Sequence, residues 1–69
     1  MPGTIPSLEE IEATVARMEE RYRDHPLFAN YLRLRERFDN DLSEARDRAL
    51  ARSAALMLIK YESESQATR

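Results

Sequence analysis

The candidate acid–base pair in this sequence of 69 residues is Asp24 and His25. His25 is the only histidine and it follows Asp24, and an imidazole beside a carboxylate is a pair that general acid–base catalysis uses. A lone histidine directly before a proline, here Pro26, more often caps a helix or lies on the surface. Catalysis also needs a cleft and a second reacting group, which a two-helix hairpin does not offer. We therefore expect no catalytic residues and no enzymatic activity.

Clustered acidic residues could suggest a metal site. Glu9, Glu12, Glu19 and Glu20 lie close together near the N-terminus. Di-iron helical bundles combine such glutamates with a Glu-x-x-His motif on facing helices, and that spacing is absent here. The sequence also has no cysteine, which excludes thiolate metal sites and disulfide bonds. We interpret the glutamates as a solvated helix face and expect neither a metal nor another cofactor.

Arginines are the main basic feature of the sequence. Six of them lie between residues 25 and 52, namely Arg33, Arg35, Arg37, Arg46, Arg48 and Arg52. Acidic side chains are interleaved with them, as Glu44 is with Arg48, at a spacing that forms weak ion pairs within one helix. The net charge is −2, and aromatic side chains that could stack on bases are few. An RNA- or DNA-binding helical hairpin dimer is therefore the weakest of three functional hypotheses.

Helices must position these residues, because no segment alternates as a strand does. Ser7-Leu8-Glu9-Glu10 is a capping box, in which the Ser7 hydroxyl accepts from the Glu10 amide. Apolar residues then recur in steps of three and four, which predicts a helix over about 8–23. They are Leu8, Ile11, Val15, Met18 and Tyr22. Residues 1–6 hold two of the three prolines and are expected to form an extended lead-in.

A second, longer helix is predicted over about 26–62. Pro26 suits the first turn of a helix, and the steps of three and four continue without a slip. The positions are Phe28, Tyr31, Arg35, Phe38, Leu42, Ala45, Ala49, Arg52, Leu56 and Ile59. Residues 63–69 are small and polar, and we expect a flexible tail. The predicted fold is all-α: a single domain over 1–69 that forms an antiparallel helical hairpin with coiled-coil packing.

The segment Asp39-Asn40-Asp41 leaves an alternative open. Three poor helix formers in a row could make a tight turn, with Asp41 as a new N-cap. A break near Asn40 would give a monomeric three-helix bundle, in which the third helix folds back over the first two. The unbroken spacing from Phe38 to Leu42 favours the continuous helix.

The lengths of the two predicted helices decide what can cover the C-terminal half. At ~1.5 Å per residue the first helix spans roughly 24 Å and the second roughly 55 Å, so the first reaches only to about Leu42. Beyond that point the apolar residues form three adjacent stripes. These are Ala49, Leu56 and Ile59; Leu50, Ala54, Met57 and Tyr61; and Ala51, Ala55 and Leu58. Soluble monomers rarely expose so much apolar surface, so we predict that another chain covers it.

The predicted partner interface lies on this part of the long helix. It consists of Ala49, Arg52, Ala55, Leu56, Met57 and Ile59. We expect a helix as the partner, because small residues four positions apart, such as Ala51 and Ala55, let two helices approach closely. The leading functional hypothesis is a small non-enzymatic interaction module that self-associates into a dimer or a helical bundle.

Residues 49–61, ALARSAALMLIKY, resemble the second helix of the small two-helix chaperones that hold needle subunits of type III secretion systems. The resemblance covers this alanine-rich segment, and the chain lacks the glycine-containing turn expected between the helices of that family. It implies the second functional hypothesis, a chaperone or adaptor whose last helix covers an apolar helix of a different protein.

The sequence also bears on where the protein acts. No run of apolar residues reaches the ~20 residues that a membrane span needs. The first residues, MPGTIPS, have neither the basic nor the apolar region of a signal peptide. Together with the absence of cysteine, these features lead us to expect a cytoplasmic protein without a membrane partner.

Overall fold

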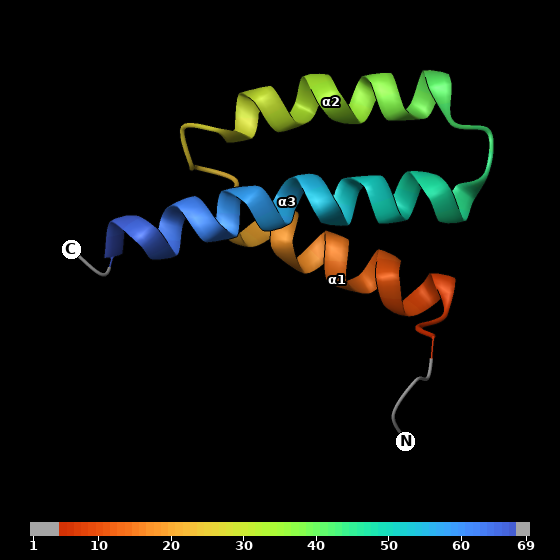
Figure 1. Ribbon diagram of the computed structural model, residues 1–69, viewed down its shortest axis with the longest axis horizontal. Helices are drawn as coiled ribbons and strands as arrows, with labels where there is room; N and C mark the ends of the chain where they lie inside the picture. Colours follow the sequence, from red (N-terminus) through yellow and green to blue (C-terminus); the bar gives the residue numbers. More distant parts are fainter. Residues whose placement is uncertain (1–4, 68–69) are drawn as a thin grey trace.

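Three α-helices make up the part of the chain that the computed structural model describes, residues 5–67 (Figure 1). Helix α1 is Leu8–Arg21, α2 is Phe28–Asp41 and α3 is Ala45–Ala67. Between residues 5 and 67 there is no strand. The all-α prediction is therefore confirmed.

The helices form a flattened arrangement with α3 between the other two. Helix α3 packs against both α1 and α2 (Figure 1). The Cα atoms extend over 36 × 34 × 15 Å, so the shortest dimension is less than half of either of the others. A helix in the middle of such a thin arrangement has one side that no other helix covers.

Helix α1 begins as its capping sequence predicts. The Ser7 Oγ accepts a hydrogen bond from the Glu10 amide at 3.2 Å. The helix ends at Arg21, two residues earlier than predicted, and the Tyr22 amide donates to the Met18 carbonyl. Tyr22 itself is buried in the core, so the chain leaves α1 with an apolar anchor.

The connection from α1 to α2 is a tight turn built around His25. The His25 amide donates to the Tyr22 carbonyl, and the Phe28 amide donates to the His25 carbonyl, both at 2.9 Å. The imidazole Nδ1 of His25 accepts from the Leu27 amide at 3.1 Å. Helix α2 therefore begins at Phe28, two residues after Pro26, and His25 has a structural role in the turn.

The prediction of one continuous helix over about 26–62 is wrong. Helix α2 ends at Asp41, Leu42 adopts an extended conformation with φ −106° and ψ 124°, and α3 starts at Ala45. The Arg48 side chain donates to the carbonyls of Leu42 and Ser43, each at 2.9 Å, which satisfies backbone oxygens in the connection. The alternative of a break near Asn40 gives the correct number of helices.

Two physical effects favour this break over a continuous helix. Aspartate and asparagine at positions 39–41 bond to nearby backbone groups in non-helical conformations, so little is lost by ending a helix there. Folding α3 back also buries Leu56 and Ile59, each worth about 1.5–3 kcal/mol. The regular spacing of apolar residues continues across the three connecting residues and therefore gave no sign of the break.

The C-terminal prediction also needs correction. Helix α3 continues to Ala67, past the predicted end near Glu62, so residues 63–67 of the expected tail are helical. At the other end, Ile5 and Pro6 are non-helical, in agreement with the expected lead-in. Residues 1–4 and 68–69 lie outside the described part of the chain.

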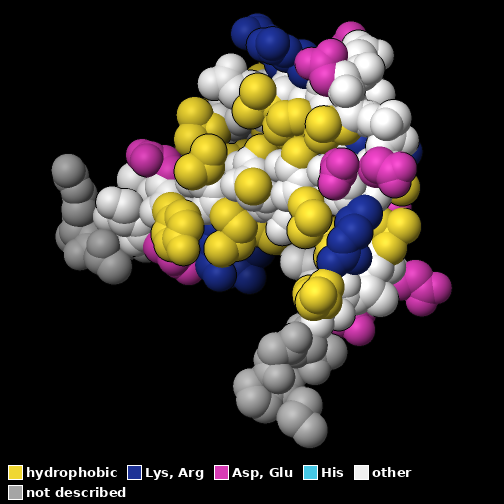
Figure 2. Space-filling model, turned by 45° about the vertical axis from the view of Figure 1, so that its right-hand side comes forward, with side chains coloured by type: hydrophobic (Ala, Val, Ile, Leu, Met, Phe, Trp, Pro, Cys, Tyr) yellow, Lys and Arg dark blue, Asp and Glu magenta, His cyan; other side chains and the backbone are white. Residues whose placement is uncertain are grey.

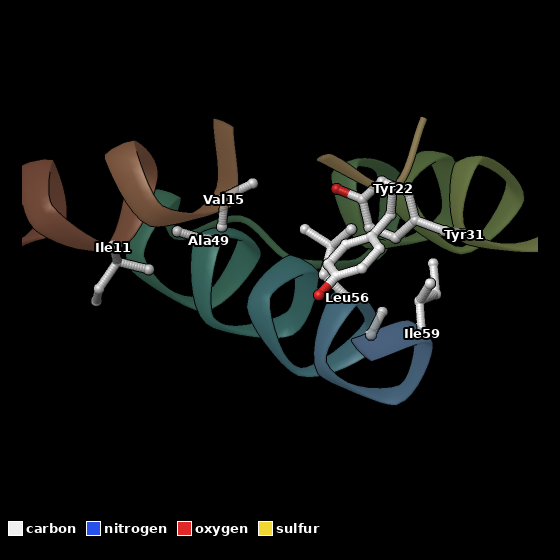
Figure 3. Close-up of a cluster of buried hydrophobic side chains, with 8 residues drawn as sticks. Ile11, Val15, Tyr22, Tyr31, Ala49, Leu56 and Ile59 are labelled. Atoms are coloured by element: carbon white, nitrogen blue, oxygen red, sulfur yellow. The ribbon is translucent and has the colours of Figure 1, made fainter. Parts of the chain in front are cut away.

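The core draws on all three helices. Its buried members are Ile11, Val15, Tyr22, Tyr31, Ala49, Ala55, Leu56 and Ile59. Leu56 is completely buried, with 0% of its surface exposed. Figure 3 shows side chains of the three helices gathered around it. Most of these positions belong to the predicted apolar pattern, but Ala49, Ala55, Leu56 and Ile59 had been predicted to contact a partner and not to fill the core.

Candidate interaction surface

The six residues predicted to contact a partner lie mainly inside the protein's own core. Ala49, Ala55, Leu56 and Ile59 are buried among the three helices. The premise of that prediction, that no part of the chain could cover residues 43–61, is therefore wrong. Once α3 folds back, α1 and α2 cover its inner side, and these four side chains are not on the surface of the folded chain.

The other two residues of the predicted interface are partly buried, and they lie in different places. Arg52 forms an ion pair with Asp39 of α2, with 2.6 Å between Nη2 and Oδ1. Its Nε is buried and has no hydrogen-bond partner among residues 5–67. Met57 lines a shallow depression between α1 and α3, together with Met18 and Tyr22. The structure thus does not bring Arg52 and Met57 together as one surface.

A polar contact joins α1 and α2 on the inner side of α3. Glu19 of α1 accepts hydrogen bonds from the Tyr31 hydroxyl and from Arg35, the latter at 3.0 Å, and both donors belong to α2. Burial raises the pKa of Tyr31 above its usual range, and the hydrogen bond and negative charge of Glu19 raise it further. The Glu19 hydrogen bond likewise raises the pKa of Arg35. These hydrogen bonds therefore link α1 to α2.

Several of the arginines considered for nucleic-acid binding are used within the fold. Arg35 and Arg52 form ion pairs with carboxylates of other helices or turns of the chain. Arg46 donates to the Pro6 carbonyl at 3.3 Å, and Arg48 holds the connection between α2 and α3. Arg48 thus bonds to backbone carbonyls where we had expected a pair with Glu44. Arginines engaged in this way do not form a free basic stripe.

The uncovered side of α3 carries a line of apolar side chains, which we call the outer face: Leu50, Ala54, Leu58 and Tyr61. The steps of four, four and three place them on one side of the helix. Leu58 lies about 200° around the helix from the fully buried Leu56. Leu50, Leu58 and Tyr61 expose 44%, 67% and 61% of their surfaces, and Ala54 is also exposed. Apolar side chains of this size gain free energy from being covered.

A groove beside the outer face extends the apolar surface onto α2. Its volume is about 180 Å³, and Leu58 belongs to both the groove and the outer face. Leu34 of α2, which is 39% exposed, contributes to the opposite wall. The lining residues are Leu27, Asn30, Tyr31, Leu34, Ala55, Leu58 and Ile59. Figure 2 shows hydrophobic side chains gathered over α2 and α3 on one side of the molecule.

The residues of the outer face were visible in the sequence as parts of the second and third apolar stripes. The predicted interface lay on the first stripe and its neighbours, because every stripe beyond Leu42 was expected to be uncovered within the chain. A helix that is apolar nearly all round indicates that an apolar stripe stays exposed, because two covering helices can bury only part of its circumference. Which stripe stays outside depends on where α1 and α2 dock.

Other types of site lack support in the described part of the chain. No group of three or more histidine, aspartate or glutamate side chains between residues 5 and 67 is arranged to hold a metal ion. Over the same residues, no helix combines the length and the hydropathy required to cross a lipid bilayer. No family model matches this chain, and neither a curated protein nor a solved structure matches it. The outer face is therefore the feature of the described residues from which a function can be proposed.

Proposed function

We propose that this protein is a small non-enzymatic interaction module that acts through helix–helix contacts and self-associates through the outer face of α3. The observation that carries the proposal is the exposure of Leu50, Leu58 and Tyr61 along one side of a single helix. Contiguous exposed apolar surface on a small protein typically marks an interaction site. Burying even a few such side chains gives a favourable free energy of several kcal/mol before the cost of association.

A helix is the partner that fits this surface best. The outer face is straight and narrow, and Ala54 near its middle lets a second helix approach closely. The neighbouring groove between α2 and α3 is apolar and shallow, so it can accept side chains of the covering helix. A second copy of the same chain supplies such a helix without any further component.

The experiment is a measurement of solution mass over a range of concentrations by sedimentation equilibrium. We expect a mass that rises from that of the 8.1 kDa monomer towards twice that value at micromolar to millimolar concentrations. Leu58→Asp should keep the protein monomeric, because it places a charge in the centre of the contact. The matched control is Leu32→Asp, since Leu32 is 39% exposed and lies in a different depression, beside Arg35. It should leave the association unchanged.

The outcomes separate self-association from the other two hypotheses. A wild-type protein that stays monomeric at all concentrations would refute self-association. If that monomer instead bound a helical peptide through Leu58, a chaperone or adaptor role would replace it. Salt-sensitive binding of RNA or DNA that depends on Arg33 and Arg37 would favour the nucleic-acid hypothesis, because phosphate contacts release counterions.

A further inference from the structure

We infer that two copies pair through antiparallel α3 helices, in a register centred between Ala55 and Leu56. The inference rests on the proposed self-association and specifies its geometry. A twofold axis beside this point places each residue before the centre opposite a residue equally far after it. Residue size and charge along α3 both favour this arrangement over a parallel one.

The sizes of the side chains on the outer face are complementary in the antiparallel register. Leu50 lies opposite Tyr61 of the second copy, and Ala54 lies within one residue of the position opposite Leu58. The small Ala54 therefore lies beside a large residue, which lets the two surfaces interdigitate there. In a parallel pair every residue faces itself, so Ala54 would meet Ala54 between two pairs of bulky leucines, and a gap would remain.

The charges flanking the outer face are also complementary. Arg46 and Glu64 are about five turns apart, so they point to the same side of α3, and Glu64 is exposed, as is Arg46. An antiparallel twofold pair brings equivalent flanks together, so Arg46 meets Glu64 of the second copy twice in each dimer. Asp47, at the end of the outer face, comes level with the uncharged Ser65.

A parallel pair would reverse this pattern. Its twofold axis brings opposite flanks together at the same height, so Arg46 would no longer meet Glu64 of the second copy. By the same geometry Glu64 would face Glu62 of the second copy. Like charges facing each other oppose association, and they do so without any compensating contact. The arrangement of basic residues early in α3 and acidic residues late in it thus selects the antiparallel orientation.

The size of the contact sets its expected strength. From Arg46 to Glu64 the paired helices run side by side for roughly 27 Å, and one helix is about 10 Å wide. This footprint is well below the ~800 Å² per partner of a standard stable interface, even with a contribution from Leu34 beside the groove. A dissociation constant in the micromolar range or weaker follows, so the dimer forms and dissociates with concentration.

Charge reversal tests the register. Arg46→Glu and Glu64→Arg should each weaken dimerisation about tenfold, because each replaces two attractive pairs by two repulsive ones. The double variant should dimerise as the wild type does, and so should an equimolar mixture of the two single variants, since both restore unlike pairs. Arg33→Glu, on the exposed surface of α2, is the matched control and should have no effect. Melting at low concentration checks that loss of the Arg46 bond to Pro6 leaves the monomer folded.

Disulfide trapping tests the orientation independently, because the sequence contains no cysteine. Asp47→Cys and Ser65→Cys variants should form a crosslinked dimer when mixed under oxidising conditions, and much more slowly when each is alone. Rapid crosslinking of each variant with itself would show a parallel pair and overturn the inference. If neither the double variant nor the mixture of single variants restored dimerisation, the antiparallel register would be overturned, but the proposed self-association would not be. A wild type that remains monomeric would refute both.

Discussion

Replacing Leu56 by alanine tests whether the last third of the chain is covered from within. Leu56 is 0% exposed and lies among the side chains of all three helices, so truncation leaves a cavity that the surroundings only partly fill. Buried Leu→Ala substitutions cost about 2–5 kcal/mol. A domain of 69 residues has a total stability of roughly 3–10 kcal/mol. We therefore expect loss of a large share of the stability, and a melting temperature lower by roughly 10–25 °C.

The matched comparison is Leu58→Ala, the same change two residues further along the same helix. Leu58 is 67% exposed in the monomer, so its truncation should cost under about 1 kcal/mol in dilute solution. Because Leu58 belongs to the outer face, the loss of stability caused by Leu58→Ala should increase with protein concentration. The loss caused by Leu56→Ala should not. This difference distinguishes a residue of the core from a residue of the contact between copies.

Urea denaturation followed by circular dichroism measures both effects. If Leu56→Ala is already unfolded in water, Leu56→Val provides a smaller step of about 1 kcal/mol. The reasoning would be refuted if Leu56→Ala stayed within about 1 kcal/mol of the wild type while Leu58→Ala cost as much or more. That result would mean that α3 extends away from α1 and α2, as the continuous-helix prediction requires.

Three further predictions concern polar side chains. The pKa of Tyr31 is raised in the folded protein, so its contribution to stability is complete below the unfolded value of about 10 and is lost as the pH rises towards the folded pKa. Urea denaturation between pH 9 and 11 should show that the free energy of unfolding falls by up to about 1.4 kcal/mol per pH unit, and that it falls less in Tyr31→Phe. Equal slopes in the two proteins would contradict a raised pKa of Tyr31. Arg52→Met should change the free energy of unfolding by less than about 1 kcal/mol. The variant loses the ion pair with Asp39, but it also removes a buried Nε that has no hydrogen-bond partner among residues 5–67. A larger loss of stability would show that the ion pair is important. His25→Ala should destabilise the fold by about 1 kcal/mol, since the Leu27 amide loses its acceptor, and no measurable change in thermal melting would mean that water replaces the imidazole.

The sequence alone was sufficient to determine the helical class, the start of the first helix and the core positions of the first two helices. Local rules decide these features: Ser7 can cap only the segment that follows it, and steps of three and four leave one apolar side on a helix. Ile11, Val15 and Tyr31 were therefore placed in the core correctly, whereas Leu56 was expected to contact a partner. The turn at residues 22–27 was also expected, because a proline there cannot continue a helix.

Only the tertiary structure decided where the chain turns back a second time and which side of α3 remains outside. Asp39-Asn40-Asp41 permits either a turn or a continuous helix, and the free energy of burying α3 against α1 and α2 is not a property of those three residues. Since α3 is apolar around most of its circumference, docking alone separates the buried Leu56 from the exposed Leu58. The uncovered side of α3 could not be assigned from helical spacing, because spacing identifies stripes and packing determines which stripe is covered.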